Sequence, residues 1–252
     1  MEVKLHLNYD LQTGLIADIS IGAGCVHDNS YNFGKDEVIL KDGLYLRDLG
    51  YYSFKYFEKL DKAGVYFISR AKTNASFYFK ANYGDYERIE LSEYFPLDAE
   101  LVDLPEVYLG SRKEKLKLRL VLEEVAQKRL AQLKKYAKKQ KDKTVSEQRK
   151  RMCHFNVFIS NVPKDKIAAN AIRLTYSLRW QIELMFKIWK SHYDIDKFHK
   201  MSIFRFETYI YARLITVLID CSIKNSLPPI FMDEFDVELS VIKASKHIKK
   251  TL

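Results

Sequence analysis

The chain has 252 residues, 47% of them hydrophobic and 30% charged, a composition that allows one large globular domain or two smaller ones. Its 9 Gly and 5 Pro argue against a loop-rich all-β fold or a disordered chain. The three cysteines have no metal-binding spacing, and no apolar run has the length of a signal peptide or a membrane span. These features argue against secreted disulfide-rich and membrane proteins, and predict a soluble, cytoplasmic protein with reduced thiols.

The net charge of +9 is concentrated in one segment. Residues 127–151 hold eleven basic and two acidic residues, which leaves 31 basic against 31 acidic residues elsewhere. Such a concentrated excess indicates a polyanionic partner, although a solvated lysine-rich helix is an equal alternative. The candidate DNA-contacting residues of this segment are Lys134, Lys135, Lys138 and Lys139.

The first third of the chain is predicted to form short strands and one helix. Residues 3–9 and 15–21 alternate apolar and polar side chains around a turn, which predicts a hairpin with one buried face. Residues 44–46 and 65–69 are expected to form buried strands. Between them, residues 53–63 have helical spacing, with Ser53 as the N-cap.

The second part begins near residue 72 with a predicted small, mostly antiparallel sheet. Its expected strands are 77–81, 86–91, 106–109 and 115–122. The basic segment follows as a helix, and residues 155–160 form another buried strand. Helices are then predicted over 167–173, 176–193 and 204–224, the last one ended by Pro228-Pro229. This order indicates an α/β domain interrupted by an insertion.

The stretch from Tyr176 to Lys190 carries the pattern most indicative of function. On a single helix with about 100° per residue, Tyr176, Arg179, Glu183 and Lys190 share an arc of roughly 60°. The opposite side collects an apolar stripe of Leu178, Ile182, Met185 and Trp189, and Trp180 is also expected to pack. A plain surface helix, with Glu183 paired to Arg179 and Lys187, is the alternative interpretation.

The spacing of these four residues resembles a family signature. Tyr, two residues, Arg, three residues, Glu, six residues and Lys is the signature of DDE transposases of the insertion-sequence-4 type, and it occurs here within the phrase LRWQIELMFK. The segments Lys4–Leu7, Asp10–Gly14, Leu46–Tyr51 and Phe158–Val162 also resemble the strands and turns of such proteins. The resemblance extends from about Val3 to Leu218.

The resemblance implies a ribonuclease H-like fold with a β-rich insertion that carries the basic helix. The expected domain boundaries are 1–72 and 153–225 for the two parts of the ribonuclease H-like domain, 73–152 for the insertion and 226–252 for a C-terminal tail. Asp48 would be the second catalytic carboxylate and Glu183 the third, although an Asp before a turn is a common structural feature.

In such proteins carboxylates hold two Mg²⁺ or Mn²⁺ ions, which cut phosphodiester bonds of DNA and transfer the strands. Tyr176, Arg179 and Lys190 would bind phosphates of the transposon end. The expected partners are therefore double-stranded DNA of the transposon ends and the target, and a second copy of the chain in a synaptic complex.

One part of the family pattern is not met. The first catalytic Asp of the family lies on a strand upstream of the segment resembling Lys4–Tyr9, so the first strand is expected to be missing and the chain to be catalytically incomplete. Asp10 and Asp18 are poor substitutes, as a turn residue and a residue on the hairpin face. Three alternatives therefore stay open: a non-catalytic DNA-binding transposase remnant, a metal-dependent nuclease of the same fold, and a structural or RNA-associated protein.

Overall fold

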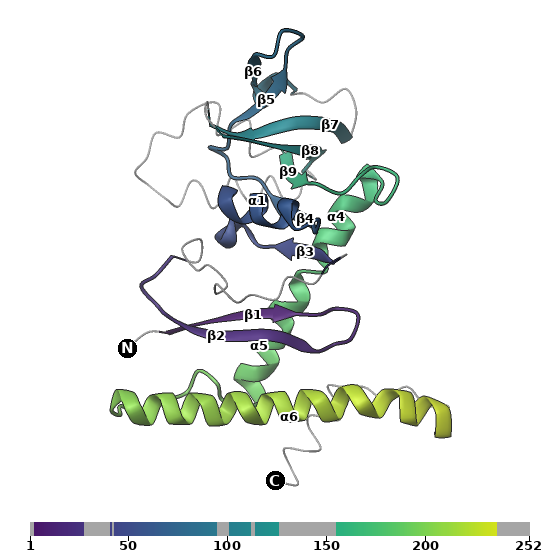
Figure 1. The fold of residues 1–252 in the computed structure, drawn as a ribbon. Helices are drawn as coiled ribbons and strands as arrows, with labels where there is room; N and C mark the ends of the chain where they lie inside the picture. Colours follow the sequence, from purple (N-terminus) through teal and green to yellow (C-terminus); the bar gives the residue numbers. More distant parts are fainter. Residues whose placement is uncertain are drawn as a thin grey trace. The chain divides into compact units, whose positions relative to one another are not determined.

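The computed structural model describes residues 3–27, 41, 43–94, 101–111, 114–125 and 155–235. The chain forms two compact units, which we name the sheet unit (Val26–Arg179) and the hairpin–helix unit (Met1–Cys25 and Trp180–Leu252) (Figure 1). The basic segment, with Lys134, Lys135, Lys138 and Lys139, lies outside the described residues.

The sheet unit is built on one seven-stranded mixed sheet, with the strand order β3-β4-β9-β8-β7-β5-β6. The strands are β3 (Leu44–Arg47), β4 (Tyr66–Arg70), β5 (Phe77–Lys80), β6 (Tyr86–Ile89), β7 (Leu101–Gly110), β8 (Lys115–Glu124) and β9 (Phe155–Ser160). The pair β3–β4 is parallel and the remaining pairs are antiparallel. The strands β5–β8, expected to form a small sheet of their own, are instead hydrogen-bonded into the same sheet as β4 and β9.

Helices and short 3₁₀ turns complete the sheet unit: η2 (Leu49–Tyr51), α1 (Phe54–Lys62), η3 (Leu91–Tyr94) and α4 (Ala169–Ser177). Helix α1 connects β3 to the parallel strand β4, because parallel neighbours need a crossover connection. Its buried residues Tyr56, Phe57 and Leu60 recur at helical spacing, which confirms the predicted helix and its N-cap position Ser53.

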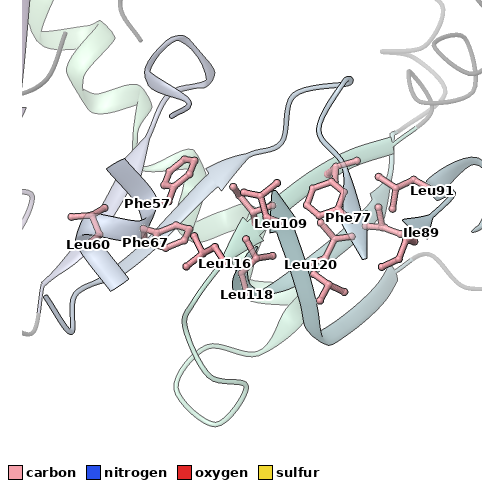
Figure 2. Close-up of a cluster of buried hydrophobic side chains, with 14 of the residues drawn as sticks. Phe57, Leu60, Phe67, Phe77, Ile89, Leu91, Leu109, Leu116, Leu118 and Leu120 are labelled. Carbon is pink, nitrogen blue, oxygen red and sulfur yellow. The ribbon is translucent and has the colours of Figure 1, made fainter. Parts of the chain in front are cut away.

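The two faces of the sheet are covered differently. One face carries the larger core, in which α1 packs on side chains of β4, β5, β7 and β8; Figure 2 shows Phe57, Phe67, Phe77, Leu109 and Leu118 together in it. A second core joins α4 to β4, β8 and β9. It consists of Ile68, Val121, Phe158, Val162, Ile172 and Tyr176.

The hairpin–helix unit consists of β1 (Val3–Tyr9), β2 (Ile16–Ala23), α5 (Trp180–His192) and α6 (Ile203–Phe235). The hairpin is the predicted one: the Asp10 carboxylate accepts hydrogen bonds from the Gln12 amide (2.9 Å) and the Thr13 hydroxyl (2.7 Å), and Asp18 is exposed on β2. A core of its own holds the unit together, with Leu7, Trp189, Ile195, Ile210, Leu214 and Val217 buried.

The predicted helix 176–193 is wrong as a single element. Helix α4 ends at Ser177 and α5 begins at Trp180, because the amides of Leu178 and Arg179 bond three residues back to Thr175 and Tyr176 and close the first helix with a tight turn. The helical phase therefore restarts, and Leu178 and Trp180 are 46% and 58% exposed instead of packed.

The other half of the apolar stripe is confirmed, since Ile182 and Met185 pack against the core in which Trp189 is 2% exposed. Helix α6 does not end before Pro228-Pro229 as predicted; it continues through both prolines to Phe235. A proline removes one helical hydrogen bond and can kink a helix without ending it. In the parts of the chain described here, no helix combines the length and the apolar character needed to cross a bilayer.

Candidate functional site

Asp48 follows the last residue of β3, at the carboxyl end of the parallel pair β3–β4. Its backbone is extended (φ −68°, ψ 153°) and it caps the 3₁₀ turn η2, with Oδ2 accepting from the Gly50 amide at 3.2 Å. Asp48 therefore has the structural role of a turn-capping aspartate. Its side chain remains 46% exposed, so the second oxygen, Oδ1, is open to a further partner.

That partner is Arg179, which lies 131 residues further along the chain in the turn after α4. Its Nε is 3.5 Å from Oδ1 of Asp48, and its side chain is only 14% exposed. The guanidinium also lies over the Tyr176 ring, with 5.8 Å between its carbon and the ring centroid. The sheet unit thus brings Asp48 together with two of the four signature residues.

Tyr176 anchors this group of side chains to the core. It is 8% exposed, and its ring contacts Phe158 edge to face at a centroid separation of 5.5 Å. Burial raises the pKa of the Tyr176 phenol. The positive charges of Arg179 and Arg70 oppose this rise, and the negative charge of Asp48 adds to it. Tyr176 is therefore a neutral hydrogen-bonding group within reach of charges of both signs.

Arg70 is a residue that the sequence pattern did not single out. It ends β4, and because Arg47 of β3 pairs with Ser69 of β4, Arg70 is the neighbour of Asp48 at the same strand ends. The only signal in the sequence was a basic residue at the end of a predicted buried strand, which is too common to indicate a site. With Arg179, it gives these strand ends two cations near Asp48, a combination suited to binding a phosphate.

Glu183 and Lys190 belong to α5 in the hairpin–helix unit. Both side chains are exposed, and seven residues place them on one face of α5, about 10.5 Å apart along the helix axis. The predicted shared face is thus confirmed for these two residues. Tyr176 and Arg179 do not share it, because they precede the start of α5 and lie in the sheet unit.

The chemistry of these carboxylates fits a hard divalent cation. Asp48 and Glu183 are oxygen donors, which Mg²⁺ and Mn²⁺ prefer over nitrogen or sulfur. Within residues 3–27, 41, 43–94, 101–111, 114–125 and 155–235, no three His, Cys, Asp or Glu side chains lie close enough to form a metal cluster. Of the expected ligands, Asp48 belongs to one unit and Glu183 to the other.

Comparison with known proteins defines the class. Residues 1–219 match the transposase DDE domain, and the chain belongs to this family, whose members generally use divalent metal ions and act on DNA. The chain is 34% identical over 260 residues to the transposase for insertion sequence element IS1151 of Clostridium perfringens, covering 96% of this chain and 54% of the relative.

Two further relatives are transposases of Bacillus thuringiensis. The one for IS231B in subspecies berliner is 30% identical over 96% of this chain and 54% of the relative. The one for IS231E in subspecies finitimus is 31% identical over 99% of this chain and 56% of the relative. The chain therefore spans about half the length of the curated relatives it matches.

Proposed function

We propose that the chain carries the Asp48 and Glu183 part of a DNA transposase of an insertion sequence, an enzyme that cuts transposon ends and transfers DNA strands by metal-assisted phosphodiester chemistry; the first catalytic Asp of the family pattern is not met in this chain. The observation that carries the proposal is the ion pair of Arg179 with Asp48, because it joins the signature to a carboxylate at a strand end. Family membership and the relatives named as transposases support it.

The proposal includes a ribonuclease H-like arrangement of the catalytic domain. The parallel unit β3-α1-β4 with Asp48 at its carboxyl end supports this arrangement. We assign residues 1–72 and 153–225 to the ribonuclease H-like domain, 73–152 to the insertion, and 226–252 to a C-terminal tail.

Asp48 and Glu183 would hold Mg²⁺ or Mn²⁺, which when bound supplies activation of the attacking oxygen and stabilisation of the leaving one. Arg179 and Tyr176 would position a DNA phosphate at Asp48, Arg179 by a charge-assisted hydrogen bond and Tyr176 through its neutral hydroxyl. Lys190, on the same face of α5 as Glu183, would hold a second phosphate. Because Arg179 already pairs with Asp48, binding of a phosphate or a metal would compete with that pair.

The test is cleavage of labelled DNA carrying the ends of the element, in Mg²⁺, in Mn²⁺ and with a chelator. In a protein supplemented with a strand that bears the first catalytic Asp, Glu183→Gln and Asp48→Asn are expected to lower the cleavage rate at least about a thousand-fold, since a catalytic metal contributes several kcal/mol and 1.36 kcal/mol corresponds to tenfold. DNA binding should be nearly unchanged. Glu207→Gln, an exposed glutamate on α6, is the matched control.

Cleavage by Glu183→Gln at the wild-type rate would refute the site. If the supplemented protein binds DNA but does not cleave it with either metal, the function is instead that of a non-catalytic DNA-binding protein. A synaptic complex further requires two copies of the chain, so the mass of the complex with end DNA, measured by light scattering, should correspond to a dimer on two DNA ends.

A further inference from the structure

The outer half of the large sheet has a solvent-facing side with an unusual composition. On β8, alternate residues share a face, so Lys115 and Lys117 lie on the same side as Val121, which α4 covers. Residues opposite one another on neighbouring strands share a side of the sheet, so Tyr108 of β7 lies on the same side as Lys117, and Tyr78 of β5 on the same side as Tyr108. Lys80 is two residues after Tyr78 on β5 and therefore shares that side too.

We name this surface the tyrosine–lysine face. Its members lie on β5, β6, β7 and β8: Tyr78, Lys80, Tyr86, Tyr108, Lys115 and Lys117. The opposite side of the same strands carries Phe77, Leu109 and Leu116, which are buried in the core (Figure 2). The strands therefore have one apolar, packed side and one polar, open side.

The side chains of the face are ordered by one another. The Lys115 ammonium lies 4.1 Å from the Tyr78 ring centroid and 4.9 Å from that of Tyr86, and it also donates to the Ser111 carbonyl. Tyr86 and Tyr108 contact each other edge to face at 5.1 Å. Lys115 is thus held by two rings and a carbonyl, and these partners do not neutralise its charge.

Acidic groups compensate only part of the positive charge. Glu106 pairs with Lys117 at 2.9 Å, and the hydrogen bonds from Lys117 and Tyr108, with the nearby charge of Lys80, hold the pKa of the Glu106 carboxyl below its usual range. Neighbouring Arg88 pairs with Glu90 at 3.4 Å. The face keeps an excess of cations, and Tyr, Lys and Arg side chains are the groups that contact DNA phosphates.

We infer that the tyrosine–lysine face binds the phosphate backbone of duplex DNA, whatever the base sequence. Tyr176, on α4, lies on the same side of the sheet, and Arg179 follows it in the next turn. The row Lys117, Tyr108, Tyr78 and Arg88 crosses four strands, or about 14 Å at about 4.8 Å per strand. That length corresponds to about four base pairs, enough for two or three phosphate contacts. The inference rests on the proposed function for its choice of DNA as the polyanion.

The experiment measures the affinity of the full chain for a 20-base-pair duplex at a series of salt concentrations. In the face variant, Lys80→Gln, Lys115→Gln and Lys117→Gln are combined. In the matched control, Lys55→Gln, Lys59→Gln and Lys62→Gln remove three exposed lysines from α1, which packs on the opposite side of the sheet. The face variant is expected to flatten the slope of log affinity against log salt by about two to three units, because each lost phosphate contact removes about 0.9.

A charge-preserving variant separates binding from folding. A variant that combines Lys80→Arg, Lys115→Arg and Lys117→Arg keeps the three charges and should keep the wild-type slope. The Lys→Gln face variant loses the lysine–ring contacts as well as the charges, so its melting temperature is measured alongside its slope. The inference is overturned if the face and control variants change the slope equally, or if neither does. It is also overturned if the face variant loses binding to polyglutamate or single-stranded RNA while its duplex affinity is unchanged. Absence of salt-dependent duplex binding in the wild-type chain would instead count against the proposed function.

Discussion

At the scale of single residues, the ion pair of Asp103 with Arg119 connects β7 and β8 to the start of α4. Arg119 donates to both carboxylate oxygens (2.9 and 3.0 Å) and to the Ile167 carbonyl (2.7 Å), and its side chain is 3% exposed. Asp103→Asn should lower the free energy of unfolding by about 3 kcal/mol, since it leaves a buried cation without its partner. Urea titration measures the change. Glu106→Gln, whose pair with Lys117 is exposed, should have a clearly smaller effect on the free energy of unfolding.

The same pair makes a prediction about pH. Burial alone would raise the pKa of the Asp103 carboxyl, but the hydrogen bonds and charges of Arg119 and Lys164 outweigh burial and lower it. Because the pKa of Asp103 is lower in the folded state, the carboxylate stabilises the fold at every pH above the unfolded-state pKa of about 3.9. This stabilisation is lost as the pH falls through the folded-state pKa. The stability difference between wild type and Asp103→Asn should therefore shrink below about pH 4. A difference that stays constant down to pH 2 would contradict the assignment.

In the hairpin–helix unit, the Tyr193 hydroxyl donates to the carboxylate of Asp220, which is 8% exposed on α6. Burial, together with this hydrogen bond, raises the pKa of the Tyr193 phenol above that of the unfolded chain. The stabilisation by Tyr193 is therefore complete at pH values below the unfolded-state pKa of about 10, and it is lost as the pH rises further. Tyr193→Phe should cost about 1–3 kcal/mol at neutral pH. The cost should diminish above about pH 10, whereas Tyr209→Phe, at an exposed position of α6, should be nearly neutral.

At the scale of elements, the β7–β8 hairpin depends on Gly110. Its φ is +143°, and an added Cβ would overlap the Glu114 carbonyl oxygen and come within 3.0 Å of the Phe54 ring. Gly64, after α1, also has positive φ (+70°) but open space around it. Gly110→Ala is therefore expected to lower the free energy of unfolding by about 2–4 kcal/mol through strain and overlap, and Gly64→Ala by about 1 kcal/mol. Equal effects in thermal unfolding would show that the hairpin relaxes freely.

At the scale of the whole molecule, the basic segment 128–151 is predicted to act as a DNA-backbone clamp, because all of the net charge lies there. Combining Lys134→Ala, Lys135→Ala, Lys138→Ala and Lys139→Ala should flatten the salt dependence of duplex affinity by up to about 3.6 units, at about 0.9 per contact. The control replaces the exposed Lys41, Lys55, Lys59 and Lys62 by Ala. An unchanged slope in the first variant would mean that the segment is only a solvated helix.

Periodicity and turn residues by themselves predicted most of the local elements. The hairpin of β1 and β2, helix α1 and strand β9 lie where alternation and helical spacing placed them, because these patterns record which side of one short segment is buried. The fixed spacing from Tyr176 to Lys190 carried the resemblance to the family signature, and that resemblance, together with its position at the end of a predicted strand, pointed to Asp48.

Only the tertiary structure decided how these pieces combine. Strand partners come from distant parts of the chain, so no local pattern predicted that β5–β8 join the same sheet as β4 and β9 or that Arg70 lies beside Asp48. The break between α4 and α5 arises from two backbone hydrogen bonds, and it leaves Arg179 in a turn outside α5, where it pairs with Asp48. The tyrosine–lysine face also depends on register across four strands, since a shift of one residue would turn its side chains into the core.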